Sequence, residues 1–276
     1  MLPSYLLSLR EGIEAALIIG IVLGALRQIR RTDLSPALWW GVIAASGVSL
    51  LAAILLTVLG LELEGPAEPI YEGATMLLAA GILTWMIFWM SQQARTLKSE
   101  LEEGVHRAAG SAGWRAIFGL AFVAVVREGI ELALFLTASV FATNTLQTSI
   151  GAALGLGTAI LLGWSIFATT VRLDLRRFFQ VTGFLLVLFA AGLVAHGVHE
   201  FNEVGLIPAV IEHIWDANAF LPAASILGQF MKALFGYNPT PSLTEMLAYF
   251  AYMAAVFTAL RSSQRKSVPA ATQTQA

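Results

Sequence analysis

The chain has 276 residues, of which 57% are hydrophobic and only 12% are charged. This excludes an ordinary water-soluble domain, in which about a quarter of the residues are charged, and it is typical of a polytopic helical membrane protein. The formal net charge of −2 excludes little until charges are assigned to sides of a membrane, whereas the absence of cysteine excludes disulfides and thiolate metal sites.

Seven stretches of the sequence are long and apolar enough to cross a bilayer, which takes about 20 apolar residues. The predicted fold is therefore all-α, with seven transmembrane helices in a single transmembrane domain over residues 1–260. The predicted spans lie at about 5–26, 37–61, 70–90, 114–142, 149–171, 178–198 and 243–260.

Three other segments are predicted outside the spans. Residues 91–113 form a polar cytoplasmic connector, and residues 199–242 form an extracytoplasmic loop. Within that loop, Phe220–Tyr237 is apolar on one helical face but too short for an easy crossing, so we expect an interfacial or re-entrant helix. The polar residues 261–276 are expected to be a disordered cytoplasmic tail.

The distribution of basic residues predicts the orientation of the chain. With the N-terminus outside, all but three of the 16 Lys and Arg residues fall in cytoplasmic segments. The exceptions are Arg10 and Arg127 within spans, and Lys232 in the outer loop. Because cytoplasmic loops are enriched in Lys and Arg, we expect an N-terminus outside and a cytoplasmic C-terminus.

One charged motif occurs twice, each time inside an apolar span. Arg10-Glu11-Gly12-Ile13-Glu14 returns as Arg127-Glu128-Gly129-Ile130-Glu131. Residues three and four apart share a helix face, so each copy presents two carboxylates and an arginine one turn from the second acid. Ionisable residues inside a membrane are costly and usually functional, which makes both motifs candidate site residues.

The motif belongs to a longer internal duplication. Span two and span five share glycines at a constant offset of 110 residues, and the second motif begins 117 residues after the first. The sequence therefore predicts two three-helix repeats, at about 5–90 and 114–198, with 243–260 as an extra helix. Because three spans are an odd number, the second repeat is inverted, as in many secondary transporters.

Inversion is expected to bring the two motifs face to face near the membrane midplane. Glu11, Glu14, Glu128 and Glu131 would then converge as metal ligands, supported by Arg10 and Arg127. Crowded carboxylates tend to hold protons, which an entering cation would displace. Oxygen-only ligands favour hard cations such as Mg, Ca, Mn or ferric iron, and charge alone does not select among them. The alternative is that each Arg–Glu pair only neutralises itself and joins helices.

These residues bring the chain close to a known family. Four features carry the likeness: the doubled motif in spans one and four, Tyr71-Glu72-Gly73 at the start of span three, Thr84-Trp85-Met86 near its end, and His199-Glu200 after span six. With these features the chain resembles the oxidase-dependent iron permeases, the EfeU type in bacteria. The likeness extends over essentially all seven spans.

This resemblance implies an iron permease of the cytoplasmic membrane rather than an enzyme, with iron as the transported ion and no permanently bound cofactor. It also implies an extracytoplasmic partner that oxidises or donates iron. The expected contacts are iron, membrane lipid and that partner, with no nucleic acid, and the number of chains that assemble is left open.

Four residues near the outer end of the bundle form a secondary candidate, which we interpret as a relay that passes cations inward or as ordinary solvated interfacial groups. Two rival functions also stay open. One is a proton-coupled transporter of another divalent metal, and the other is an intramembrane iron-dependent redox enzyme, against which the lack of His in both motifs argues. The candidate relay consists of Glu72, His199, Glu200 and Glu203.

Overall fold

The computed structural model describes residues 1–63, 65–93, 101, 103–105, 107, 113–168, 175–223 and 225–266. Within these ranges the regular elements are helices and no strand is present, so the predicted all-α class is confirmed. Short connections join α1 to α2 and α5 to α6. The elements are α1 (Leu2–Gln28), the 3₁₀ helix η1 (Thr32–Leu34), α2 (Ser35–Glu62), α3 (Ala67–Gln93), α5 (Trp114–Ala142), α6 (Thr145–Ala168), α7 (Leu175–Glu203), α8 (Ile226–Phe235) and α9 (Leu243–Lys266).

Five helical segments of the described chain are long and apolar enough to cross a membrane. They correspond to predicted spans two, three, five, six and seven, which supports a multi-pass membrane protein. The other two predicted spans, α1 and α5, have 27 and 29 residues and contain the charged motifs. The five segments are Thr32–Leu59, Ala67–Phe88, Thr145–Ser165, Arg177–Glu203 and Leu243–Ser262.

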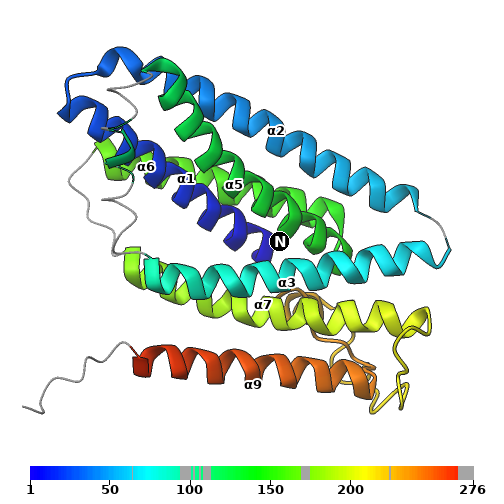
Figure 1. Ribbon diagram of the computed structural model, residues 1–276. Coiled ribbons are helices and arrows are strands. Elements are labelled where there is room, and N and C mark those ends of the chain that lie inside the picture. Colours follow the sequence, from blue (N-terminus) through cyan, green and yellow to red (C-terminus); the bar gives the residue numbers. More distant parts are fainter. Residues whose placement is uncertain are drawn as a thin grey trace, which may run out of the picture.

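The helices form a bundle in which α1 and α5 lie at the centre. Helix α2 packs along α5, α6 packs along α1, and α3 packs along α7, with α9 on the far side of α7 (Figure 1). Leu7 of α1, Met76 of α3, Phe135 of α5 and Phe189 of α7 share one buried hydrophobic cluster. This shared core fixes the two helices that carry the motifs relative to each other.

Glycines allow the closest helix pairs to approach. A Cβ atom at Gly12 of α1 would lie 2.6 Å from the Cβ of Ala159 on α6, and one at Gly129 of α5 would overlap Ser49 of α2. Small residues at such contacts allow backbones in a membrane to pack by van der Waals contact. The glycine inside each motif therefore has a packing function, with a neighbouring helix pressed against it.

The segment predicted as interfacial or re-entrant contains a helix, α8, of ten residues, which is too short to cross a bilayer. Ser225 caps its N-terminus by accepting a hydrogen bond from the Gly228 N–H at 2.9 Å, and Gly236 ends it with a positive φ of 67°. Gly236 packs directly on Gly192 of α7, eleven residues before the end of that helix at Glu203. At 1.5 Å per residue this contact lies roughly 17 Å from the C-terminal end of α7, so α8 packs against the side of that helix.

Several helices extend beyond the predicted boundaries, most of all at the C-terminal ends of α7 and α9. Helix α7 continues to Glu203, so residues 199–203 are helical rather than part of the loop, and α9 continues to Lys266, five residues past the predicted start of the tail at Arg261. Polar residues at both ends interrupt the apolar pattern without interrupting helical hydrogen bonding, so hydropathy places the boundary too early. Residues 267–276 and most of 91–113 lie outside the described residues.

The packing of α2 on α5 predicts opposite effects for two glycines of α2. A Cβ at Gly41 would lie 2.6 Å from the backbone carbonyl oxygen of Phe118, whereas Gly47 has nothing within 4 Å of that position. Gly41→Ala should therefore destabilise the protein by about 1–3 kcal/mol, because the backbone of α5 must move. Gly47→Ala should be neutral or slightly stabilising, since alanine is the better helix former.

Thermal unfolding of the two purified variants in one detergent measures this difference. Equal unfolding temperatures for Gly41→Ala and Gly47→Ala would contradict the described contact between α2 and α5.

Candidate cation-binding site

The two charged motifs meet where α1 packs against α5. One carboxylate oxygen from each of Glu11, Glu128 and Glu131 can be chosen so that all lie within 4.8 Å of one another. Glu11 and Glu128 are buried and Glu131 is half-buried. Oxygen ligands lie about 2.0–2.6 Å from a bound cation, so two of them can be up to about 4–5 Å apart. Three of the four predicted ligands are therefore close enough to share an ion.

The fourth predicted ligand, Glu14, has a different position. Its Oε1 lies 3.2 Å from Nε of Arg10, one helical turn earlier, and the Arg10 side chain is only 2% exposed. Glu14 is outside the group of three, although it is close enough to Glu128 and Glu131 for their charges to act on it. The two acids of the first motif thus have different neighbours. Glu14 pairs with Arg10 of its own helix, whereas Glu11 lies close to the acids of α5.

The second motif repeats the ion pair in a more open setting. Nε of Arg127 donates to Oε1 of Glu131 at 3.1 Å, but the Arg127 side chain is 38% exposed. Its guanidinium also lies 5.8 Å from the ring centroid of Trp85 on α3, within reach of a cation–π interaction. The surroundings of the two motifs are therefore unequal, and the second is the more accessible.

Several carboxylate oxygens of the site are buried without a hydrogen-bond donor. Both oxygens of Glu11 and Oε2 of Glu131 are inaccessible and have no hydrogen-bond partner within the described chain. Leaving buried polar atoms unsatisfied is costly, and a buried charge is costlier still unless it is paired or binds a metal. Four acids and two arginines amount to a formal charge of −2, which a bound cation or protons would offset.

The four predicted outer residues gather where α3 begins and α7 ends. His199 on α7 lies 3.5 Å from Glu203, measured from Nε2 to Oε1. Glu72 of α3 is near enough to Glu203 and Glu200 for their charges to interact. Their ligand atoms do not form a compact group like that of the two motifs, so they are a cluster of mostly acidic side chains without the geometry of a formed ion site.

Glu245 joins this outer cluster in a way that the sequence did not reveal. Together with Ser242 it forms the capping box typical of a helix start, in which the Glu245 N–H donates to Ser242 Oγ at 3.1 Å and the Ser242 N–H donates to Glu245 Oε2 at 3.4 Å. The same carboxylate lies 3.4 Å from Nδ1 of His199 and is buried. The capping box can be recognised in the sequence because Ser242 and Glu245 are three residues apart. The contact between Glu245 and His199 cannot, because it depends on how α9 packs against α7.

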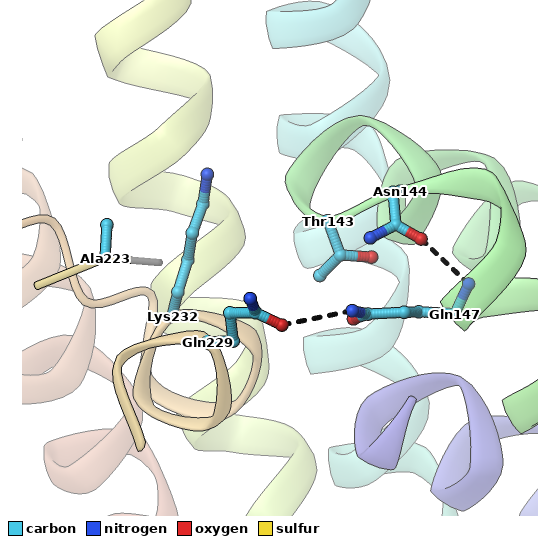
Figure 2. A pocket seen from close by; sticks show the side chains of 6 residues that line it. All are labelled: Thr143, Asn144, Gln147, Ala223, Gln229 and Lys232. Carbon is cyan, nitrogen blue, oxygen red and sulfur yellow. Dashed lines mark hydrogen bonds between the residues drawn. The ribbon is translucent and has the colours of Figure 1, made fainter. Parts of the chain in front are cut away.

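A separate cavity of about 320 Å³ lies between the α5–α6 turn and α8. Figure 2 shows Gln147 pointing across it toward Gln229, and the two side chains form a hydrogen bond of 3.2 Å. One lysine and no acid line this cavity, so its chemistry is unsuited to a cation. The lining residues are Thr143, Asn144, Gln147, Ala223, Gln229 and Lys232.

Comparison with known proteins agrees with the resemblance seen in the sequence. The model of the iron permease FTR1 family matches residues 1–265. The chain belongs to this family. A member described as the ferrous iron permease EfeU of Shigella sonnei (strain Ss046) is 34% identical over 273 residues, covering 98% of this chain and 99% of that protein. The EfeU of Yersinia pestis is 34% identical over 256 residues, covering 92% and 90%. No solved structure matches the chain.

Because Arg10 is more deeply buried than Arg127, replacing the two arginines should lower the stability of the protein by different amounts. Arg10→Gln would remove a fully buried cation and leave the half-buried Glu14 carboxylate without its partner, which should cost about 3–5 kcal/mol. Arg127→Gln should cost less, about 1 kcal/mol, because its pair is partly exposed. Adding Glu14→Gln to Arg10→Gln should restore most of the loss.

Unfolding temperatures of the metal-free variants in detergent measure these effects. Equal losses for the two arginine variants, or no recovery in the double variant, would contradict the described pairing.

Proposed function

We propose that the protein imports iron across the cytoplasmic membrane through a cation site formed by its two Arg-Glu-x-x-Glu motifs. The observation that carries this proposal is the grouping of Glu11, Glu128 and Glu131 within 4.8 Å, because it joins both motifs in one buried cluster of oxygen ligands. Iron as the cargo is supported by family membership and by relatives described as ferrous iron permeases.

The transport mechanism that we propose is alternating access of two inverted repeats. Helices α1, α2 and α3 would correspond to α5, α6 and α7, giving seven spans with α9 as the extra helix. The packing supports this correspondence, because Gly12 of α1 faces Ala159 of α6 while Gly129 of α5 faces Ser49 of α2. Gly12 and Gly129 differ by 117 residues and Ser49 and Ala159 by 110, the two offsets of the sequence repeat. Transporters of this design bind substrate between their repeats.

The proposed path begins at the acidic mouth formed by Glu72, His199, Glu200 and Glu203. We place this mouth and the N-terminus outside, and the C-terminus in the cytoplasm, from the distribution of basic residues. Negative charge there would raise the local concentration of cations before they reach the midplane. The cation would then exchange with protons on Glu11, Glu128 and Glu131 and leave on the cytoplasmic side. An extracytoplasmic protein that oxidises or donates iron is the proposed partner.

The ligand set separates this proposal from its rivals. Di-iron carboxylate enzymes combine Glu with Glu-x-x-His pairs, whereas the cluster between α1 and α5 contains carboxylates alone. A transporter of another divalent metal is the remaining alternative, because oxygen ligands suit manganese as well as iron. Competition between metals distinguishes the two transporters.

Uptake of radiolabelled iron into proteoliposomes tests the proposal. Glu11→Gln and Glu131→Gln should each reduce uptake more than tenfold, since each removes a charged ligand from the only compact carboxylate group of the described chain. Glu203→Gln should have a smaller effect because it lies at the mouth, and the exposed loop residue Glu212→Gln serves as the matched control. Manganese and zinc are added as competitors, and a pH gradient is imposed to detect proton exchange.

Normal uptake by both motif variants, at equal insertion into the vesicles, would reject the midplane site. Complete inhibition by a small excess of manganese would instead favour the other divalent-metal transporter.

A further inference from the structure

Buried hydroxyl groups on the long helices of this protein usually have a partner in their own helix. Ser49 Oγ donates to the Ala45 carbonyl at 2.8 Å, Thr137 Oγ1 to that of Ala133 at 2.9 Å, and Thr182 Oγ1 to that of Phe178 at 2.8 Å. Donation to the carbonyl four residues earlier is the ordinary way to satisfy Ser or Thr within a helix. Hydroxyls satisfied in this way are not available to a ligand.

Ser8 of α1 departs from this pattern. The residue is 0% exposed, and its Oγ is buried with no hydrogen-bond partner within the described chain. A buried unsatisfied hydroxyl is unfavourable, and a native structure that keeps one generally has a reason for it.

The position of Ser8 connects it to the site. Ser8 precedes Glu11 by three residues, so the two side chains share one face of α1. Glu11 also has two buried carboxylate oxygens without a partner, so adjacent turns of one helix carry unsatisfied polar groups. On its other side Ser8 is held against α6, where a Cβ at Gly155 would lie 2.8 Å from the Ser8 Cβ. Ser8 thus packs against α6, about one helical turn before Glu11.

From this arrangement we propose that Ser8 is a further cargo-binding residue, whose hydroxyl oxygen contacts the cation held by Glu11, Glu128 and Glu131 or a water bound to that cation. A hard cation binds six or more oxygens, so three carboxylates leave positions for neutral oxygen ligands. A hydroxyl oxygen can coordinate a cation through a lone pair while its O–H donates a hydrogen bond to a carboxylate. This inference rests on the proposed function of the same site.

Comparison of the two repeats indicates that the Ser8 hydroxyl is not needed for helix packing. At the offset of the motifs, 117 residues, the position matching Ser8 is Val125 of α5, which is apolar and buried. The packing position therefore accepts a side chain without a hydroxyl. We infer that the polar group at Ser8 serves the ligand and makes the site asymmetric, with its neutral oxygen contributed by α1.

A ligand role and a purely structural role predict different results for Ser8→Ala. Under the ligand role, removing an unsatisfied buried hydroxyl should leave the metal-free protein as stable as the wild type or make it more stable, whereas loss of a structural hydrogen bond would make it less stable. Only under the ligand role should the same change weaken metal binding. The matched control is Ser49→Ala, which removes a buried hydroxyl that already has a partner, next to the glycine of the second motif.

The experiment titrates the full-length chain in detergent with ferrous iron under anaerobic conditions, and separately with manganese, following metal-induced thermal stabilisation. Ser8→Ala should weaken binding about tenfold, the lower end of the range for losing a supporting polar partner at a metal site. Ser49→Ala should bind within twofold of the wild type.

Wild-type affinity in Ser8→Ala, with binding that still depends on Glu11, would overturn the role of Ser8 and leave the proposed site intact. Absence of saturable binding in the wild type, or binding that survives Glu11→Gln unchanged, would overturn the proposed site and this inference together. A metal-free Ser8→Ala protein that is clearly less stable than the wild type would also count against the inference, because the hydroxyl would then have a structural partner.

Discussion

Two ion pairs within single helices are the interactions on which the rest of the structure depends. Arg10 pairs with Glu14 and Arg127 with Glu131, at 3.2 and 3.1 Å, each one turn apart. Each pair neutralises one acid without help from another helix, so that the bundle can hold these groups at membrane depth. Glu11 and Glu128 are then the surplus acids, and their approach across α1 and α5 creates the uncompensated negative charge that a cation can bind.

Close helix packing turns these surplus acids into one site. Gly12 and Gly129 lie inside the motifs and face α6 and α2, so each motif helix is held from behind by a neighbour while its acids face inward. The two halves are nevertheless unequal, since Arg10 is 2% exposed and Arg127 is 38% exposed. In the proposed alternating-access cycle, the opposite state would bury Arg127 and expose Arg10. The glycine contacts join a helix of one repeat to a helix of the other, α1 to α6 and α5 to α2, so each of these pairs would move as one unit.

Sequence alone predicted the helices and the chemical class of the site, because long apolar runs and a doubled charged motif are strong local signals. It did not reveal which acids form the compact group. Glu11 and Glu14 share a face of α1, and only the rotation of α1 against α5 makes Glu11 the closer ligand. The contact of Glu245 with His199 likewise depends on how α9 packs on α7. Ser8 has no signal in the sequence, since serine is ordinary in membrane helices and only its missing hydrogen bond distinguishes it.

The central claim is that both motifs contribute to one cation site of oxygen ligands, and X-ray absorption of iron bound to the purified chain tests it most directly. The account predicts one iron per chain, an inner shell of oxygen atoms, and loss of that iron in both Glu11→Gln and Glu128→Gln. Two irons per chain, each lost in only one of these variants, would mean that the motifs act separately. Nitrogen ligands in the inner shell would move the site to the histidines near the end of α7 and contradict the account.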